Sequence, residues 1–388
     1  MSDFLHNELR KLTNHLSALQ PAMVEALREL VEYQSPSTDK PLLDALAQRL
    51  QERYQRLGAE AITFANATHG DHVCAAFATD HDSPTTQPGL LLGHFDTVWP
   101  VGTLAARPFH IHDGKAWGPG VFDMKAGIVV AEFALRAIGD LGLRFPRPVV
   151  VLMTSDEEIG SPTSRPLIEE HARHAEYVLV LEPPLPDGAL KTARKGVGHF
   201  ILEIEGRAAH AGVEPEKGIS AVEELAHQVL HLHSLSDPSQ GTTVNVGVIR
   251  GGTRSNVVAA HAQLEVDARA WTTVEAERIE GTILRSSPLT PGATLRVEGG
   301  FNRPPMERSP AIAALFQRAQ RIGCELGIEL QEGRTGGGSD ANFSAALGVP
   351  TLDGLGALGD GAHAEHEHIY IDSLPTRAAL LAALLLRL

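Results

Sequence analysis

The stretch "GLLLGHFDTVWP", residues 89–100, decides the fold. The three leucines at 90–92 form a short apolar run between glycines, a pattern typical of a strand covered on both faces in a parallel sheet. His94 and Asp96 then lie at the carboxyl end of that strand. Because ligands of open α/β sheets bind in the crevice at the carboxyl ends of the strands, the stretch predicts a functional site there.

Length and composition narrow the class of protein. The chain has 388 residues, enough for about two domains, and its 43% hydrophobic and 21% charged residues are typical of globular proteins. A formal net charge of −15 argues against nucleic acid as a partner. The start of the chain lacks the layout of a secretory signal, and no apolar run is long enough to span a membrane. We therefore expect a cytoplasmic protein that does not bind membranes.

The expected order of helices and strands changes once along the chain and later returns to the first type. In the first half, helical segments alternate with apolar strands, among them residues 148–153 and 177–181, and each of these two strands is followed by acidic residues. The segments "HFILEIEG" and "AQLEVDAR" alternate apolar and polar residues, which favours antiparallel strands with one buried face. We predict an α/β domain with a mostly parallel sheet and helices on both faces, built from residues 1–194 and 306–388. An α+β domain at 195–305 interrupts it.

A helix is expected between these antiparallel strands, in "GISAVEELAHQVLHLHSL". Apolar residues recur there at helical spacing and predict the buried face. That face comprises Ile219, Val222, Leu225, Ala226, Val229 and Leu230. His227 and His231 have the spacing of metal ligands on a helix, but Gln228 replaces the glutamate of a metalloprotease motif, so we expect them at the surface.

Histidines and acids gather at the predicted strand ends. They are His94, Asp96, Asp123, Glu157, Glu158, Glu182 and His363. Carboxylates that face one crevice repel each other unless a cation compensates, and mixed histidine and carboxylate ligands suit zinc best, with cobalt or manganese as substitutes. Three ligating carboxylates balance two zinc ions better than one. Of the adjacent Glu157 and Glu158, one can bind metal while the other acts as general base.

These segments resemble a known family of enzymes. The motifs "GHFDTVWPVGT", "GPGVFDMKAG", "TSDEEIGSPTSR", "GRAAHAGVEPEKGISAVEELA", "GGTRSNVVAAHAQLEVDAR" and "RTGGGSDANF" occur in order over roughly residues 25–385. Together they are similar to the co-catalytic zinc peptidases and deacylases, which include glutamate carboxypeptidase, acetylornithine deacetylase, succinyl-diaminopimelate desuccinylase and aminoacylase. The "RTGGGSDA" loop and the spacing of "SDEEIGS" most resemble glutamate carboxypeptidase.

The resemblance implies two metal sites that share one bridging carboxylate. The implied ligands are His94, Asp123 and Glu182 for one zinc ion, and Asp123, Glu158 and His363 for the other. Glu157 would be the general base, and Asp96 would orient His94. The choice of His363 follows from the family's small-residue turn, and His366 and His368 are by default expected at the surface.

The resemblance also implies roles for the inserted domain, which dimerises and acts as a lid in such relatives. His210 resembles the histidine that reaches across a dimer to polarise the scissile carbonyl. The implied substrate-anchoring positions are Asn256, Arg269, Arg303, Gly336, Gly337 and Gly338. Ala126 departs from the family's usual "DMKGG", and its methyl group is expected to affect packing rather than ligation.

We therefore expect a zinc-dependent amide hydrolase and a homodimer. The leading hypothesis is removal of a C-terminal amino acid from a small-molecule or peptide substrate with a free carboxylate, as in glutamate carboxypeptidase. The alternative is an N-acyl amino acid deacylase of the acetylornithine deacetylase or succinyl-diaminopimelate desuccinylase type. A non-catalytic binding relative would have lost Glu157 or several ligands, and all of these residues are present.

Overall fold

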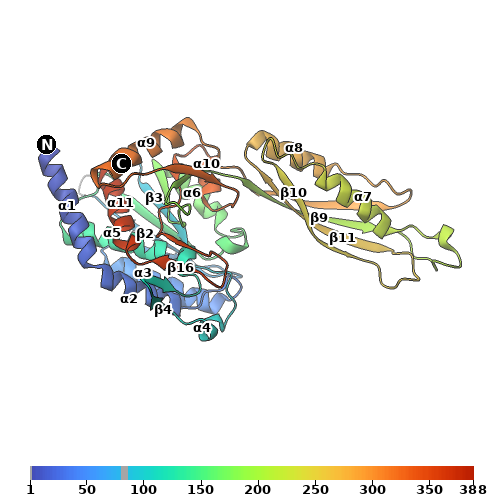
Figure 1. Cartoon of the computed structure of the whole chain (residues 1–388), viewed down its shortest axis with the longest axis horizontal. Helices are drawn as coiled ribbons and strands as arrows, with labels where there is room; N and C mark the ends of the chain where they lie inside the picture. The colour runs from blue at the N-terminus through green and yellow to red at the C-terminus, as the bar shows by residue number, and fades with distance from the viewer. Residues whose placement is uncertain (1, 80–85) are drawn as a thin grey trace. The chain divides into compact units, whose positions relative to one another are not determined.

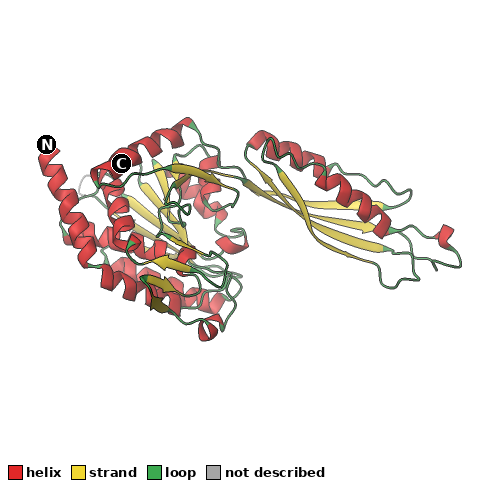
Figure 2. Ribbon diagram, in the orientation of Figure 1, coloured by secondary structure: helices red, strands yellow, loops and turns green. Residues whose placement is uncertain are grey.

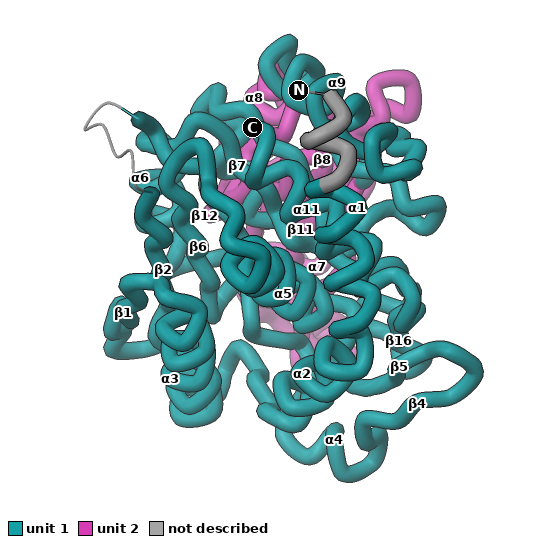
Figure 3. Tube along the Cα trace, turned by 90° about the vertical axis from the view of Figure 1, so that its left-hand side faces the viewer, with its two compact units in different colours: residues 1–192, 308–335, 339–388 teal, residues 193–307, 336–338 magenta. Residues whose placement is uncertain are grey.

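The computed structural model describes residues 2–79 and 86–388. These residues form two compact units (Figure 3). Unit 1 comprises residues 1–192, 308–335 and 339–388, and unit 2 comprises residues 193–307 and 336–338. No helix in the described ranges is long and apolar enough to cross a membrane.

The main sheet of unit 1 has six strands among the described residues, in the order β1-β2-β6-β3-β7-β14. Figure 1 labels β2 and β3 of this sheet. The strands are β1 Glu60–Phe64, β2 His72–Phe77, β3 Gly89–His94, β6 Val149–Thr154, β7 Tyr177–Val180 and β14 Thr351–Leu352. Strands β6, β3, β7 and β14 pair in parallel, whereas β1 pairs antiparallel with β2, and β2 with β6. The sheet therefore has a parallel centre and an antiparallel edge.

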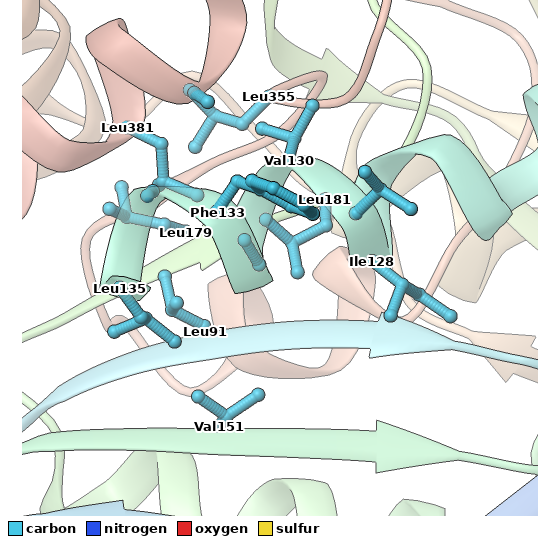
Figure 4. Close-up of a cluster of buried hydrophobic side chains, with 14 of the residues drawn as sticks. Leu91, Ile128, Val130, Phe133, Leu135, Val151, Leu179, Leu181, Leu355 and Leu381 are labelled. Atoms are coloured by element: carbon cyan, nitrogen blue, oxygen red, sulfur yellow. The ribbon is translucent and has the colours of Figure 1, made fainter. Parts of the chain in front are cut away.

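Strand β3 lies at the centre of this sheet and is buried on both faces. Its three leucines at 90–92 are at most 1% exposed. Leu91 packs with Val151 and Leu179 against helix α5 (Figure 4). Because side chains alternate along a strand, the leucines on either side of Leu91 point to the opposite face, which is covered as well. The prediction of a strand buried on both faces is confirmed.

Helices surround this sheet. They are α1 Ser2–Ala18, α2 Gln20–Glu32, α3 Lys40–Arg56, α4 Thr103–Ala106, α5 Ala126–Asp140, α6 Arg165–His174, α9 Pro310–Glu325, α10 Ala341–Ala346 and α11 Ser373–Arg387. Helix α5 packs against α11, and α1 packs against both. Asp39 and Ser309 cap α3 and α9, because each side chain accepts a hydrogen bond from a backbone N–H of the first turn.

Two smaller sheets and two short turns complete unit 1. The strands are β4 His110–His112, β5 Lys115–Trp117, β8 Leu190–Arg194, β13 Glu332–Thr335, β15 Gly359–Asp360 and β16 His368–Tyr370, and the turns are η1 Val121–Lys125 and η2 Glu157–Ile159. One sheet has the order β15-β16-β5-β4, and the other pairs β13 with β8. The turns η1 and η2 carry three of the acids expected at the site.

Unit 2 contains an antiparallel sheet with the order β10-β11-β9-β12. Figure 2 shows this sheet and its helices. Its elements are β9 Gly196–Glu205, the turn η3 Pro215–Lys217, α7 Ala221–His233, β10 Thr243–Gly251, β11 His261–Ala270, α8 Thr273–Leu284 and β12 Thr294–Arg303. Strands β9 and β11 alternate buried and more exposed residues, as predicted, and α7 and α8 both contact them. The buried set includes Phe200, Leu202, Leu264 and Ile279.

The predicted buried face of helix α7 is right in part: Leu225 is buried and Val229 is half-buried against the same core, but other predicted positions are exposed. The helix buries Ala221, Glu224, Leu225, Gln228 and Leu232, and it leaves Val222 42% and Leu230 73% exposed. The reason is a polar contact that the apolar pattern does not encode. The Glu224 carboxylate accepts hydrogen bonds from the Gln228 amide and from the backbone N–H groups of the loop at 289–290, which turns this face inward.

Candidate metal centre

Neighbouring parallel strands bring the acids and histidines of unit 1 together. His94 ends β3, the turn η2 follows β6, and Glu182 comes shortly after β7. Because β6, β3 and β7 run in parallel, their carboxyl ends meet at one edge of the sheet. β3 also lies between β6 and β7, so the chain continues first to one side of β3 and then to the other. Open α/β sheets bind their ligands at such a point. The turns η1 and 361–367 supply the remaining residues.

The side chains converge around Asp123. His94 Nε2 lies 3.3 Å from Asp123 Oδ1 and 3.3 Å from Glu182 Oε1. His363 Nε2 lies 3.4 Å from Asp123 Oδ2 and 3.1 Å from Glu158 Oε2. Each oxygen of the Asp123 carboxylate thus faces a different imidazole, and each imidazole also faces a second carboxylate.

These contacts have the spacing of ligands around a shared cation. Among the described residues, His94 Nε2, Asp123 Oδ1 and Glu158 Oε1 are buried atoms without a hydrogen-bond partner. Buried polar atoms in native proteins are almost always satisfied. Ligand atoms about 2.0–2.2 Å from one zinc ion in tetrahedral geometry lie roughly 3.3–3.6 Å from each other. The separations at Asp123 match this spacing, so the residues present fit divalent cations.

The electrostatics of this cluster also favour a bound cation. Burial raises the pKa of the Glu158 carboxyl to about 7, although contact with His363 opposes this. Contacts with Asp123 and Glu158 raise the pKa of His363 to about 10. Burial alone would lower the pKa of His94, but three neighbouring carboxylates raise it well above its usual value. Without a cation the cluster must hold protons, because its carboxylates outnumber its imidazoles.

Comparisons with known proteins agree with this geometry. A model of the peptidase family M20/M25/M40 matches residues 90–387. The chain belongs to this family. It is 31% identical over 379 residues to carboxypeptidase G2 from Pseudomonas sp. (strain RS-16), an alignment that covers 95% of this chain and 90% of that protein. The predicted metallopeptidase class is therefore confirmed.

Solved structures of other proteins share the fold. Aminopeptidase PepT from Bacillus cereus ATCC 10987 has a TM-score of 0.75 at 25% identity, covering 95% of this chain and 98% of that one. The M20 family metallo-carboxypeptidase Sso-CP2 from Sulfolobus solfataricus has a TM-score of 0.72 at 18% identity, covering 94% and 98%. The predicted fold class, a mostly parallel α/β sheet with a separate antiparallel insertion, is confirmed.

Asp96 has more contacts in this M20 chain than the sequence indicates. His94 Nδ1 lies 3.1 Å from the backbone oxygen of Asp96 and 3.3 Å from its carboxylate. The same carboxylate accepts hydrogen bonds from the backbone N–H groups of Glu157, at 3.2 Å, and Glu158, at 3.1 Å, and from the hydroxyl of Ser37, at 2.7 Å. One buried aspartate therefore holds both the imidazole and the turn η2.

The histidine-rich turn differs in part from expectation. His363 has a left-handed backbone with φ of 61°, which is uncommon for residues other than glycine and is often found at functional sites. His366 is exposed, as expected. His368 is only 5% exposed, and its ring lies tilted against Trp117 with 4.5 Å between centroids. The default surface placement of His368 is therefore wrong, because β16 turns its side chain toward β5.

Two buried residues near the centre were not predicted. The Glu367 carboxylate is buried against the turn η1. Arg377, on the apolar helix α11, donates hydrogen bonds to the carbonyls of Gly354 and Gly356. Gly356 approaches the backbone of Glu182 so closely that a Cβ would meet that carbonyl at 2.9 Å. The only sequence signal for the role of Arg377 is that it is a charged residue within an apolar helix. No sequence signal distinguishes the buried Glu367 from Glu365.

The candidate residues of unit 2 form two groups. In the first group, Arg269 Nη1 lies 3.5 Å from the backbone oxygen of Gly336, and a Cβ on Gly338 would meet Arg303 Cδ at 2.9 Å. In the second, Asn256 accepts a backbone hydrogen bond from Ala211, the residue after His210. His210 and Asn256 are both exposed.

Strand β9 separates the two groups. Arg269 and Arg303 both pair with Val197, near the start of β9, whereas His210 follows its end at Glu205. Eight residue steps from Val197 to Glu205 span about 27 Å at the usual strand rise. The structure therefore does not bring all of the expected substrate positions of unit 2 together.

Proposed function

We propose that the protein is a dinuclear zinc exopeptidase that removes a C-terminal amino acid, in the manner of a glutamate carboxypeptidase. The single observation that carries this proposal is the convergence of two imidazoles and several carboxylates on Asp123, with three buried atoms left unpartnered among the described residues. The name of the relative at 31% identity, carboxypeptidase G2, supports the direction of cleavage.

The distances support a ligand set divided by Asp123. His94, Asp123 and Glu182 would hold one zinc ion, and Asp123, Glu158 and His363 the other. Cobalt or manganese could replace zinc, because the same nitrogen and oxygen donors suit them. When bound, the cations supply Lewis acidity to the scissile carbonyl and lower the pKa of the attacking water.

Glu157 is the proposed general base. Its carboxylate oxygen lies within 4.8 Å of ligand atoms of His94 and Glu182, so it borders the same space. It takes a proton from the attacking water, holds it on a carboxylate oxygen, and delivers it to the leaving amine nitrogen. Asp96 fixes the backbone N–H of Glu157 and so sets the direction of its side chain.

The group formed by Arg269, Arg303 and residues 336–338 is the proposed anchor for the substrate carboxylate. Guanidinium groups bind carboxylates through two parallel hydrogen bonds, which gives both affinity and orientation. Asp267 accepts hydrogen bonds from Arg269 at 2.8 and 2.9 Å and holds its guanidinium in place.

The other group, His210 and Asn256, is proposed to serve the active site of a partner subunit. One small substrate cannot reach both ends of β9, about 27 Å apart. A homodimer through unit 2 is supported by the free edge of β10, where Val248 is 39% and Ile249 59% exposed, and by Leu230 on α7. Exposed apolar residues beside an open strand edge favour pairing with a second copy.

Mixed dimers test this assignment. His210→Ala and Glu157→Gln chains are each expected to be nearly inactive alone, whereas mixing them restores about a quarter to a half of the activity, because one site then receives an intact residue from each chain. Absence of any restored activity, with mixed dimers verified by size and differential tags, contradicts the trans role.

The substrate class has its own experiment. Metal-stripped protein is reloaded with zinc and assayed on N-acyl-glutamates, dipeptides and N-acetylornithine. The carboxypeptidase proposal expects the highest kcat/KM on substrates ending in an acidic amino acid. A preference for N-acetylornithine would favour the deacylase alternative, and no zinc-dependent hydrolysis of any of them would contradict the enzyme proposal.

A further inference from the structure

A buried carboxylate links three segments around the candidate metal centre. Glu367 lies in the turn between His363 and strand β16 and is only 2% exposed. Its two oxygens accept four hydrogen bonds. The donors are the backbone N–H groups of Gly120 at 2.8 Å, Phe122 at 2.9 Å and Asp123 at 3.0 Å, and the indole Nε1 of Trp99 at 2.8 Å.

These four contacts use the whole accepting capacity of the side chain. An ionised carboxylate offers about four lone-pair positions, and each oxygen of Glu367 receives two donors. Glu367 therefore has no position left for a cation or for a proton in transit. Burial raises the pKa of the Glu367 carboxyl, and these four hydrogen bonds oppose that rise.

The donors come from segments that carry proposed ligands. The backbone of η1 carries Asp123, and Trp99 lies in the loop that follows His94 and Asp96. Glu367 itself follows His363 by four residues. A single side chain thus joins the three stretches of chain that must stay in register for Asp123 to face both imidazoles.

We propose that Glu367 is a positioning residue that holds the backbone of Asp123 between His94 and His363, so that both cations can bind. The inference rests on the proposed function for its metal ligands. Glu367 acts only through Asp123 and the adjoining loops. Its removal therefore weakens metal binding without removing a ligand.

Three variants of the full chain test the proposal. Glu367→Gln keeps the shape but turns one oxygen into an amide donor, which faces two N–H groups. Trp99→Phe removes one of the four donors and leaves the carboxylate. Glu365→Gln is the matched control, because Glu365 is exposed and lies two residues away in the same turn.

The measurement is zinc affinity, by competition of each metal-stripped protein with a chromophoric chelator. Loss of an outer contact to a metal ligand typically weakens metal binding about 10–100-fold, and we expect this for Glu367→Gln. Trp99→Phe should weaken it by a smaller factor, and Glu365→Gln should match the wild type. Thermal unfolding of the metal-free proteins, measured alongside, reports any general loss of stability.

Each outcome decides the point. If Glu367→Gln unfolds at a lower temperature but binds zinc like the wild type, Glu367 only stabilises the fold, and the inference is overturned. If that variant does not fold, Trp99→Phe decides, and an unchanged zinc affinity overturns it. Wild-type protein that binds no zinc removes the proposed function and this inference together. Zinc binding by the wild type without peptide hydrolysis removes only the proposed function.

Discussion

A buried carboxylate of unit 2, Glu224, and a buried carboxylate of unit 1, Asp123, have different surroundings. In unit 2, Glu224 is fully buried, and its oxygens accept hydrogen bonds from Gln228 and from the backbone of Leu289 and Thr290. In unit 1, Asp123 Oδ1 is buried and has no such partner among the described residues. Burial of an acid is therefore no sign of a ligand. At Asp123 the informative combination is an oxygen without a donor on a carboxylate that faces two imidazoles.

The largest expected effect comes from removing metal, which acts on unit 1 alone. Treatment with a strong chelator should abolish hydrolysis, and zinc should restore it. Zinc at 1,000 times the dissociation constant of a site should also stabilise the folded protein by about 4 kcal/mol for each of the two proposed sites. Activity assays and calorimetry of stripped and reloaded protein check both. Full activity after verified removal of metal would contradict the view that Asp123 differs from Glu224 because it binds metal.

The next effect separates the two adjacent acids of η2. Glu157→Gln should lower kcat by about 10²–10⁴-fold and leave zinc content unchanged, because a general base contributes that much and binds no metal. Glu158→Gln is the matched variant and should lose zinc. Kinetics together with metal analysis checks this, and zinc loss in Glu157→Gln would make Glu157 a ligand instead.

A smaller effect is expected at the arginine group of unit 2. Arg269→Ala should raise KM about 10–100-fold, since hydrogen bonds to charged groups contribute about 1.5–3 kcal/mol, and zinc content should not change. Arg296→Ala is the control, because Arg296 is 70% exposed on β12, at the opposite edge of the sheet from β10. A fall in kcat with constant KM for Arg269→Ala would exclude an anchoring role in substrate binding.

The smallest effect concerns Glu224 and depends on pH. Burial would raise its pKa, but the hydrogen bonds outweigh burial and lower it below the usual 4.5. The ionised carboxylate therefore stabilises the fold above pH 4.5, and this contribution is lost as the pH falls through the folded-state pKa. Glu224→Gln should cost about 1–3 kcal/mol of unfolding free energy at pH 7.

Denaturant unfolding at several pH values measures the Glu224 effect. The difference between wild type and Glu224→Gln should shrink at pH values below 4.5, and zinc affinity should be the same in both proteins. A difference that stays constant with pH would mean that the charge of Glu224 contributes nothing.

Much of the metal centre follows from the sequence, because strand ends are local signals. The apolar runs before His94, Glu157 and Glu182 predict parallel strands, and such strands share one carboxyl edge. That rule brings together side chains nearly ninety positions apart. The turn with His363 needed the family resemblance, since three histidines compete there and spacing alone does not separate them.

The remaining features depend on contacts between distant segments. Glu365 and Glu367 are alike in sequence, and only the register of β16 decides which one is buried. The buried face of α7 depends on a loop about 60 residues later, which donates to Glu224. The separation of His210 from Arg269 follows from strand pairing in β9 and β11, so motifs that look like one substrate site become two groups.

The distance along β9 has a consequence for how such an enzyme would be regulated. If His210 completes the site of the neighbouring chain, a solitary chain has all of its metal chemistry and still turns over poorly. Specific activity would then fall on dilution. A chain with a defective His210 in the same cell would also inactivate the site of the chain with which it pairs. Protein concentration itself would set the catalytic rate per molecule.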